Sequence, residues 1–387
     1  MHRSLRAPEW SNDGEDEART ATGGPRHGWT HHGPAQAVIV GPQHEPPRYV
    51  PRDAQTPMGP TARLVRRLTP QGLIAATRPM RAVVRSSTPA AIWWTARKRA
   101  KWSVRTPRTF NEKVEYKMAW DRNPMLRVFA DKVASREYVS RVVGPHVLAT
   151  HHAVVDDPRD LDLEGLPSRY VVKPSHASGA VIIVHDLADP SHRLPVLPTD
   201  RGWAGATAWV RPEHLERDRF DAMCDHWLRH DYWRALGSTE WAYRGIPRRL
   251  VVEEFLEEDG SIARDFKFMV THGRVTWFRV NHRTADGETT AHFDRDGGLL
   301  PFEYSNPRPP TPPELPPTLD EMIRIAEALG ADTDLVRVDL YDADGRIVFG
   351  ELTNYPSAGR ASFDPPAYDA IMGAPWHPTR RYRSPEG

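Results

Sequence analysis

Residues 335–353, LVRVDLYDADGRIVFGELT, decide the fold of this 387-residue chain. Apolar and polar side chains alternate on both sides of Ala343-Asp344-Gly345, which predicts two antiparallel strands, 335–341 and 346–352. The glycine suits the left-handed position of a three-residue loop, so we expect a bulged hairpin. Acidic side chains stand on both strands, and the register decides which of them meet.

The three-residue loop sets that register. It places Arg337 opposite Glu351 and Asp339 opposite Phe349, so that Asp339 and Glu351 become diagonal neighbours on one face. Two carboxylates on one face are costly unless a cation lies between them. Arg337 can supply that charge alone, and so can Mg²⁺, which binds one or two carboxylates together with phosphate oxygens. The opposite face belongs to the core through Val336, Val338 and Leu340.

A lysine follows another apolar stretch. Tyr170-Val171-Val172-Lys173-Pro174 predicts a strand, and Lys173 lies just before the small-residue loop Ser175-His176-Ala177-Ser178-Gly179. Such a loop can hold a phosphate through its backbone N–H groups, while the ammonium adds a point charge. The pattern is not a P-loop, because that motif leads into a helix and a strand follows here.

Helices and strands intermix along the rest of the chain, which predicts an α+β or α/β protein. Thr318 and Glu321 predict a capping box at the start of a helix, and Gly330 stands at the C′ position of the same helix. We expect further helices over 131–142 and 213–235, and strands over 169–173, 180–184, 249–255, 265–270 and 275–281.

Composition excludes several classes of protein. The chain has 52 Lys and Arg against 51 Asp and Glu, 37 prolines and one cysteine, Cys224. A single cysteine cannot form a disulfide framework or a multi-cysteine zinc ribbon, and no apolar run approaches the ~18 residues of a membrane span. No signal-peptide pattern is visible, so we expect a cytoplasmic protein.

The first hundred residues differ from the rest. Residues 1–60 hold nine prolines and seven glycines, which predicts a disordered tail. The Arg/Trp-rich segment 61–106 lies within a stretch, 54–111, that has twelve cationic and no acidic residues. It suits an anionic membrane surface, a polyanionic glycan or RNA, or it is a solvated linker. No RNA-binding motif accompanies it, so we expect no specific nucleic acid; membrane binding would make the protein peripheral to the inner face.

Several short motifs recur in a fixed order along the chain: RTFNEK (108–113), WDRNP (120–124), ADKVASREY (130–138), VKP (172–174), VEEFL (252–256), DFKF (265–268), RVDLY (337–341) and FGELT (349–353). Their order and spacing over about 107–376 resemble the ATP-grasp superfamily. The resemblance is greatest to its TupA-like branch, which is associated with teichuronopeptide synthesis.

This resemblance implies a nucleotide site. Lys132 and Lys173 match the two phosphate-binding lysines, and the loop after Lys173 matches the flexible phosphate lid. Glu253 and the backbone of Leu256 match the adenine contacts, and Asp265 matches the ribose contact. The residues expected to bind ATP are Lys132, Lys173, Ser175, His176, Ser178, Gly179, Glu253, Glu254, Leu256 and Asp265.

The resemblance also implies a magnesium site. Asp339 and Glu351 match the Mg²⁺ ligands of the superfamily. Its members usually carry Asn two residues after the second metal carboxylate, where this chain has Thr353, with Asn354 next to it. Either Thr353 or Asn354 can therefore complete the metal shell, and we name Asn354 as the third ligand.

Four basic residues are expected to act on the substrate. The resemblance implies that Lys267 faces the γ-phosphate and that Arg337 lies near an acyl phosphate. Arg279 and Arg283 are candidates for holding a substrate carboxylate, or they lie on a solvent-facing strand edge.

The expected function is that of an ATP- and Mg²⁺-dependent carboxylate–amine ligase. It would form an amide bond through an acyl phosphate, in cell-envelope polysaccharide, teichuronopeptide-like or secondary-metabolite biosynthesis. Its partners would be a small-molecule or glycan-linked carboxylate and an amine acceptor. Two alternatives remain: a phosphotransferase acting on a glycan or lipid hydroxyl, and a non-enzymatic module tethered to an anionic surface.

The expected class is α+β, with two subdomains of an ATP-grasp fold that clasp a nucleotide. We expect a tail (1–60), a basic segment (61–106), the N-terminal part of the ATP-grasp region (107–168), a lid subdomain (169–256), a C-terminal subdomain with the Mg²⁺ site (257–376) and a second tail (377–387).

Overall fold

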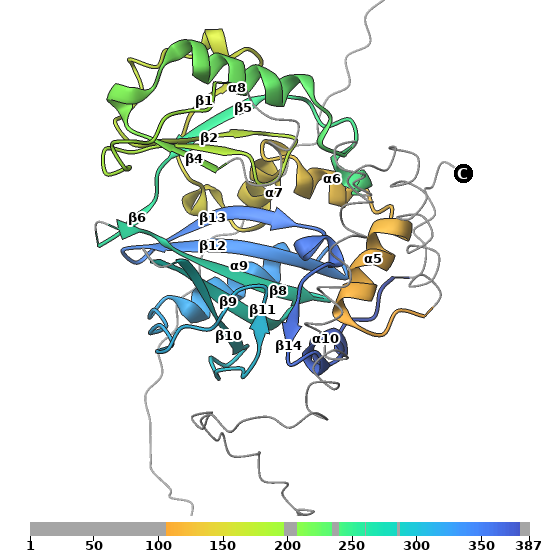
Figure 1. Ribbon diagram of the computed structural model, residues 1–387. Coiled ribbons are helices and arrows are strands. Elements are labelled where there is room, and N and C mark those ends of the chain that lie inside the picture. The colour runs from red at the N-terminus through yellow and green to blue at the C-terminus, as the bar shows by residue number, and fades with distance from the viewer. Residues whose placement is uncertain (1–105, 197–206, 234–239, 260, 285–286, 380–387) are drawn as a thin grey trace, which may run out of the picture. The chain divides into compact units, whose positions relative to one another are not determined.

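The computed structural model describes residues 106–196, 207–233, 240–259, 261–284 and 287–379 (Figure 1). All of them belong to Ile74–Gly387, one of the two compact units into which the chain divides. The tail 1–60 and nearly all of the basic segment 61–106 lie outside the described residues. Within the described part, no helix is both long and apolar enough to cross a membrane.

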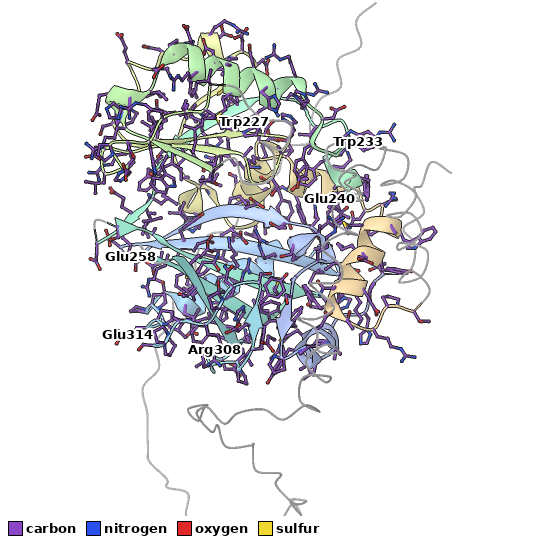
Figure 2. The ribbon with its side chains drawn as sticks, viewed as in Figure 1. Trp227, Trp233, Glu240, Glu258, Arg308 and Glu314 are labelled. Carbon is purple, nitrogen blue, oxygen red and sulfur yellow. The ribbon has the colours of Figure 1, made fainter. Side chains whose placement is uncertain are left out.

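The first of two five-stranded sheets, sheet I, contains the strand that ends in Lys173 and Pro174. Its order is β1-β5-β2-β3-β4, and all neighbours are antiparallel except β3 and β4. The strands are β1 (His151–Val155), β5 (Leu250–Glu254), β2 (Tyr170–Pro174), β3 (Val181–Val184) and β4 (Thr207–Val210). Helix α8 (Arg217–Arg229) packs on this sheet (Figure 1), and Trp227 of that helix is fully buried (Figure 2).

The second sheet, sheet II, contains the hairpin 335–353. Its order is β10-β9-β8-β12-β13, and every neighbouring pair is antiparallel. The strands are β10 (Gly287–Asp294), β9 (Arg274–Thr284), β8 (Arg264–Thr271), β12 (Leu335–Ala343) and β13 (Arg346–Thr353). The α+β class is confirmed.

The alternation of β12 divides sheet II into an apolar and a polar face. The predicted core residues Val336, Val338 and Leu340 are fully buried and pack with α9 (Leu319–Leu329), which presents Met322 and Ala326 to the same cluster. Burying these apolar side chains stabilises the sheet. The remaining helices and short strands are α5 (Phe110–Trp120), α6 (Met125–Ala130), α7 (Ala134–Val142), α10 (Ala367–Gly373), β6 (Glu257–Glu258), β7 (Ser261–Ile262), β11 (Glu303–Tyr304) and β14 (Phe363–Asp364).

Two details expected for the helix after Thr318 are wrong. The Thr318 hydroxyl donates to Asp342 of β12 and makes no capping bond, so there is no capping box here. Gly330 has φ −91° and is not left-handed. Its small size is needed for another reason, because a Cβ atom there would lie 2.8 Å from Cβ of Val270.

A capping box does occur at the start of α5. The Thr109 hydroxyl accepts from the backbone N–H of Glu112 (3.2 Å), and the Glu112 carboxylate accepts from the backbone N–H of Thr109 (3.2 Å). The other expected elements are found with shifted ends. For example, α7 begins three residues later than predicted, because Asp131 accepts hydrogen bonds from Val133 and Ser135 and forms the turn that precedes the helix.

Candidate functional site

The register expected for the hairpin is wrong. The loop has two residues, Asp344 (φ 53°) and Gly345 (φ 83°), and Ala343 pairs with Arg346. Positive φ at both loop residues is the geometry of a type I′ turn, which joins twisted strands better than the three-residue loop we expected. On this register alone, Glu351 would lie opposite Val338 and would point into the apolar core.

A bulge at Gly350 corrects the direction of Glu351. The pairing shifts between Leu340 and Asp339, so that Leu340 faces Phe349 while Asp339 faces Glu351 directly. Gly350 is the extra residue, and the space around it is closed: a Cβ atom would lie 2.7 Å from Cε2 of Tyr341. The bulge therefore keeps Phe349 in the core and sets the two carboxylates side by side on the polar face.

Asp339 is buried and bound by two cations. Arg337 donates from Nε to Oδ1 and from a terminal nitrogen to Oδ2, both at 2.6 Å, and Lys267 donates to Oδ2 at 2.6 Å. Lys267 also lies 2.5 Å from Asp265. Burial alone would raise the pKa of Asp339, but Arg337 and Lys267 lower it to about 2. Asp339 is thus a carboxylate at any physiological pH.

Glu351 lies on the other side of Arg337, 3.7 Å from its guanidinium. Its Oε1 accepts a hydrogen bond from the Thr353 hydroxyl at 2.6 Å. Burial opposes the charge of Glu351, yet Lys132 and Arg337 hold its pKa below the ordinary value. Both carboxylates on the polar face are therefore ionised and surrounded by cations.

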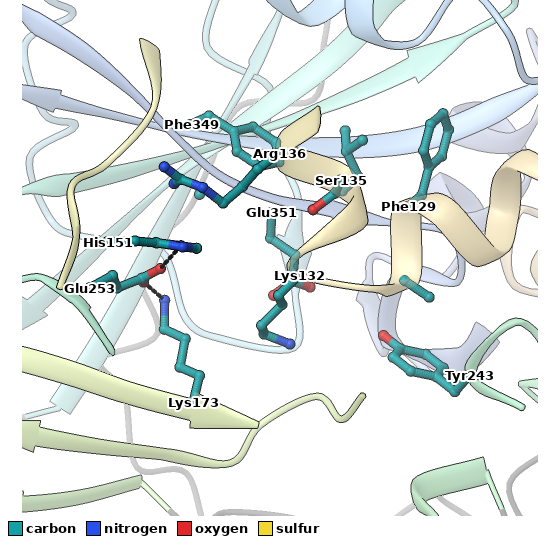
Figure 3. A pocket seen from close by; sticks show the side chains of 13 residues that line it. Phe129, Lys132, Ser135, Arg136, His151, Lys173, Tyr243, Glu253, Phe349 and Glu351 are labelled. Atoms are coloured by element: carbon teal, nitrogen blue, oxygen red, sulfur yellow. Dashed lines mark hydrogen bonds and ion pairs between the residues drawn. The ribbon is translucent and has the colours of Figure 1, made fainter. Parts of the chain in front are cut away.

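A pocket brings predicted residues from both sheets together (Figure 3). Its walls include Lys132, Lys173, Glu253 and Glu351, and it encloses about 450 Å³, part of it open to solvent. Lys173 forms an ion pair with Glu253, and Lys132 donates to the carbonyl of Ala177 at 2.5 Å. Burial lowers the pKa of Lys132; in Lys173 the carboxylate of Glu253 outweighs burial and raises the pKa.

Two basic side chains of this pocket escaped the sequence analysis. Arg136 lines the pocket, and among the described residues its side chain donates to the backbone carbonyl of Ala149, at 2.7 Å. His151 of β1 lies opposite Glu253 of β5, 3.9 Å from its carboxylate (Figure 3). Burial and the charge of Arg136 lower the pKa of His151 to about 4, so its ring is neutral. Arg136 could have been predicted from the sequence, because it belongs to the same ADKVASREY motif as Lys132. His151 belongs to none of the motifs.

The loop after Lys173 is fastened to the protein at its first two residues. Ser175 is fully buried, with its hydroxyl donating to the carbonyl of Pro247 at 2.6 Å. His176 is also buried, with Nε2 3.2 Å from the carbonyls of Trp227 and His230. Only Ser178 and Gly179 approach the surface, so a phosphate at this loop would meet backbone N–H groups and not the Ser175 or His176 side chains.

The residues expected around adenine and ribose separate into two groups. Glu253 lines the pocket, whereas Glu254 points elsewhere and binds Arg346 at 3.0 and 3.1 Å. The carbonyl of Leu256 accepts from the N–H of Ala263 at 3.1 Å. Asp265 stands on β8 beside Lys267, and its assignment to ribose stays a prediction, as do those of Glu254 and Leu256.

The remaining predicted residues lie near sheet II. Arg279 of β9 pairs with Lys267 of β8, which puts it on the polar face. Arg283 lies further along β9, and its side chain is outside the described residues. Asn354 donates to the carbonyl of Leu126 at 2.7 Å, while Thr353 contacts Glu351. The contacts therefore favour Thr353 over Asn354 as the neighbour of a metal at Glu351; both assignments stay predictions.

The acidic pair has the chemistry of a Mg²⁺ site. Mg²⁺ prefers oxygen ligands and usually takes one or two carboxylates, completing its shell with phosphate oxygens and water. Asp339 and Glu351 offer two ionised carboxylates on adjacent strands. Within the described ranges no three His, Cys, Asp or Glu side chains gather into a closed metal cage. The residues present thus fit a nucleotide-borne Mg²⁺.

Residues 222–376 match the sequence model of a family described as TupA-like ATPgrasp. No curated protein matches the chain.

Similar solved structures include two ligases and a macrocyclase. D-Alanine–D-alanine ligase from Bacillus anthracis complexed with ATP is 18% identical, with 64% of this chain and 63% of that chain covered and a TM-score of 0.36. The ATP-grasp ligase PsnB, complexed with a phosphomimetic variant of its minimal precursor, Mg and ADP, is 11% identical (60% and 52% covered, TM-score 0.31). The macrocyclase MdnC from Microcystis aeruginosa, bound with precursor peptide MdnA, is 9% identical (61% and 56% covered, TM-score 0.29).

The chain spans less than two thirds of the length of each of these three proteins. The family match covers all of β5 and sheet II, and with them Glu253, Asp339 and Glu351. Residues 222–376 of this α+β protein are thus similar in sequence to the TupA-like ATP-grasp family.

Proposed function

We propose that the protein is an ATP- and Mg²⁺-dependent ligase that joins a carboxylate to an amine. The observation that carries this proposal is the meeting of Lys132, Lys173, Glu253 and Glu351 in one pocket, although they come from segments more than 200 residues apart. Glu351 in turn faces Asp339 across the hairpin. Cations and carboxylates arranged in this way suit a magnesium triphosphate.

The proposal assigns a role to each of five charged residues of the site. Lys132 and Lys173 bind the phosphates, and Glu253 accepts from the adenine amino group. Lys173 is held by Glu253 before the nucleotide arrives, which keeps its ammonium charged inside the pocket. Asp339 and Glu351 hold Mg²⁺. When bound there, Mg²⁺ neutralises phosphate charge and orients the γ-phosphoryl group.

The reaction needs charge neutralisation more than a protein nucleophile. An oxygen of the substrate carboxylate attacks the γ-phosphorus while the bond to the β–γ bridging oxygen breaks, giving an acyl phosphate and ADP. The amine nitrogen then attacks the acyl carbon, the bond to the phosphate oxygen breaks, and the amine releases a proton. Lys267 and Arg337 lie beside Asp339, where they can offset the negative charge that develops in both steps.

We also propose a class of substrate and a location in the cell. The acid is a small molecule or a glycan-linked carboxylate, and the product belongs to a cell-envelope polysaccharide, a teichuronopeptide-like polymer or a secondary metabolite. The resemblance to the TupA-like branch supports this choice. The basic segment 61–106 would hold the enzyme at the inner face of the membrane while the catalytic part stays in the cytoplasm.

Hydroxylamine trapping tests the proposed chemistry. The full-length protein is incubated with ATP, Mg²⁺, hydroxylamine and one acid at a time from glucuronate, polyglucuronate, glutamate and alanine. The proposal predicts acid-dependent ADP release with formation of the matching hydroxamate, because hydroxylamine intercepts an acyl phosphate.

Asp339→Asn should abolish both products, and Asp344→Asn, an exposed change on the same hairpin, should leave them unchanged. Transfer of phosphate to a glycan or lipid hydroxyl without any hydroxamate would refute the ligase and establish the phosphotransferase. No nucleotide turnover or binding would leave only the tethered module.

A further inference from the structure

We propose that Arg279 anchors a substrate carboxylate on the polar face of sheet II, beside the phosphate pocket. This inference rests on the proposed function and deepens it, because it assigns the acid a binding group of its own. Arg279 is separate from the cations that bind Asp339 and from the lysines of the pocket.

The Arg279 side chain is largely buried, and no carboxylate among the described residues pairs with it. The residue is only 8% exposed, and its Nε has no hydrogen-bond partner. Among the described residues no ion pair or hydrogen bond of its side chain is found; its contact is with the ring of Tyr304, 5.0 Å below the guanidinium. Burying a cation without an anionic partner costs free energy. This cost suggests that an anionic ligand binds here.

Lys117 is a buried cation with a structural role, and it offers a comparison with Arg279. Lys117 is fully buried, and its ammonium donates to Asp121 (2.7 Å), to Thr333 (3.1 Å) and to Asp334. All three of its N–H groups are thus satisfied. Arg279 has five N–H donors and none of these partners, which distinguishes it from a structural arginine.

Its position follows from the strand register. Glu351, Asp339, Lys267 and Arg279 face one another in turn across β13, β12, β8 and β9. Neighbouring strands lie about 4.8 Å apart, so Arg279 stands one strand beyond Lys267 and two beyond Asp339. A carboxylate on Arg279 would therefore lie next to the γ-phosphate position proposed for Lys267.

The charges around Arg279 leave an excess of positive potential. Lys267 and Arg337 approach it on the same face, while the nearby carboxylates Asp265 and Asp339 are already bound by those two cations. Burial, and after it the charge of Arg337, lower the pKa of Arg279, while Asp339 and Asp265 act in the opposite direction. An incoming anion would relieve this repulsion.

The ring of Tyr304, which lies beneath Arg279, is hydrogen-bonded to a turn of unusual conformation. The Tyr304 hydroxyl donates to the Ser357 hydroxyl oxygen at 3.1 Å. Ser357 (φ 50°), Ala358 (φ 49°) and Gly359 (φ 65°) form three consecutive left-handed residues just after β13, a conformation that costs free energy in non-glycine residues. Such strain often marks a binding site. Ser357 is exposed, so this support extends from Arg279 to the surface.

A second basic residue lies on the same side of sheet II. Arg308, on the loop after β11 (Figure 2), contributes with Arg279 to a low pKa of about 3 for the buried ring of His292, after burial itself. His292 pairs with Arg279 across β10 and β9. The ring stays neutral, so it adds no positive charge beside the guanidinium.

Stability of the ligand-free protein gives the first test. Arg279→Met replaces an unpaired buried charge with an apolar side chain of similar length, so the Tm should stay the same or rise. Arg274→Met, an exposed change on the same strand, serves as the matched control. A large fall in Tm for Arg279→Met alone would mean that Arg279 stabilises the fold, and the proposal would be wrong.

Ligand-induced shifts give the second test. Acetate, glutarate, glutamate and glucuronate are added to the full-length protein at constant ionic strength, each beside its uncharged amide. We expect at least one acid, but not its amide, to raise the Tm by about 2 °C or more in the wild type and in Arg274→Met. Arg279→Met should lose the shift. A wild-type Tm that no acid moves, or a shift that survives in Arg279→Met, overturns the proposal.

A non-hydrolysable ATP analogue with Mg²⁺ separates this inference from the proposed function. The analogue should raise the Tm of all three proteins, because Arg279 does not line the phosphate pocket. If the analogue has no effect while the acid shift depends on Arg279, the ligase fails and the carboxylate site stands. If the analogue binds and no acid does, the carboxylate site fails and the nucleotide site stands.

Discussion

Asp339 and Glu351 lie directly opposite each other on β12 and β13, and one extra residue, Gly350, brings them together. Without the bulge, the two-residue turn would send Glu351 to the apolar face with Val338. The bulge thus links a local irregularity of the backbone to the chemistry of the site, because both carboxylates must share a face to bind one cation.

Replacing Gly350 should damage both the fold and the site. In Gly350→Ala the new Cβ would lie 2.7 Å from Cε2 of Tyr341 and 3.3 Å from the carbonyl oxygen of Asp339, so the strand must shift. We expect a loss of about 1–3 kcal/mol in the free energy of unfolding, measured by urea denaturation, together with weaker Mg²⁺-dependent nucleotide binding. Arg346→Ala, an exposed change on the same strand, should cost less than about 1 kcal/mol. Equal losses in both variants would show that the bulge is dispensable.

Loss of a pocket lysine should weaken nucleotide binding. Lys173→Met removes a charged hydrogen-bond donor from the pocket and leaves Glu253 without its cation. A charge-assisted hydrogen bond contributes about 1.5–3 kcal/mol, so the Kd for the ATP analogue should rise roughly 10- to 100-fold by calorimetry. Arg159→Gln removes an exposed ion pair with Asp225 and should leave the Kd unchanged. An unaltered Kd in Lys173→Met would exclude this lysine from the site.

Acid should destabilise the protein through His292. The ring is fully buried, and burial followed by the charges of Arg279 and Arg308 lowers its pKa from 6.5 to about 3. Between these values the unfolded chain binds a proton that the folded protein does not, so the free energy of unfolding falls as pH drops. At pH 5 the loss from His292 alone is about 2 kcal/mol relative to neutral pH.

His292→Phe should remove this part of the pH dependence. Phenylalanine suits the surrounding rings, of which Phe302 and Trp277 lie 4.5 and 5.9 Å away, and it has no unpaired ring nitrogen. Urea denaturation at pH 7.5, 6.0 and 5.0 measures the effect. His151, whose pKa is lowered to about 4, acts in the same direction, so a smaller slope remains. A slope identical to that of the wild type would contradict the assignment to His292.

Lys117 should be essential for stability. Lys117→Met leaves Asp121 and Asp334 buried without their cation, and breaking a buried ion pair in this way costs about 3–5 kcal/mol. Lys113→Met on the same helix removes hydrogen bonds to two backbone carbonyls, those of Gly373 and Trp376, and should cost about 1–3 kcal/mol. Thermal and urea unfolding compare the two variants. A smaller loss for Lys117 than for Lys113 would be the contrary result.

The sequence predicted the strands of the fold because alternation is a local property. The core face of β12 was readable from Val336, Val338 and Leu340, since residues two apart share a face. The register of the hairpin was not, because it depends on the space around Gly350, and that space is set by Tyr341 of the partner strand. The capping box at Thr318 failed for a similar reason: Asp342, distant in sequence, takes its hydroxyl.

Residues of the pocket were predictable from the sequence where they belong to a short motif. Lys132, Lys173, Glu253 and Glu351 all belong to short motifs, and all four line it. His151 carries no such signal, because only the pairing of β1 with β5 brings it to Glu253. The burial of Ser175 and the isolation of Arg279 likewise depend on partners supplied by other segments of the chain.

A crystal structure of the full-length protein with Mg²⁺ and a non-hydrolysable ATP analogue is the most direct test of the proposed nucleotide site. We predict the triphosphate against Lys132 and Lys173, and a Mg²⁺ ion about 2.1 Å from carboxylate oxygens of Asp339 and Glu351. A nucleotide bound elsewhere, or a metal that contacts neither carboxylate, would contradict the account.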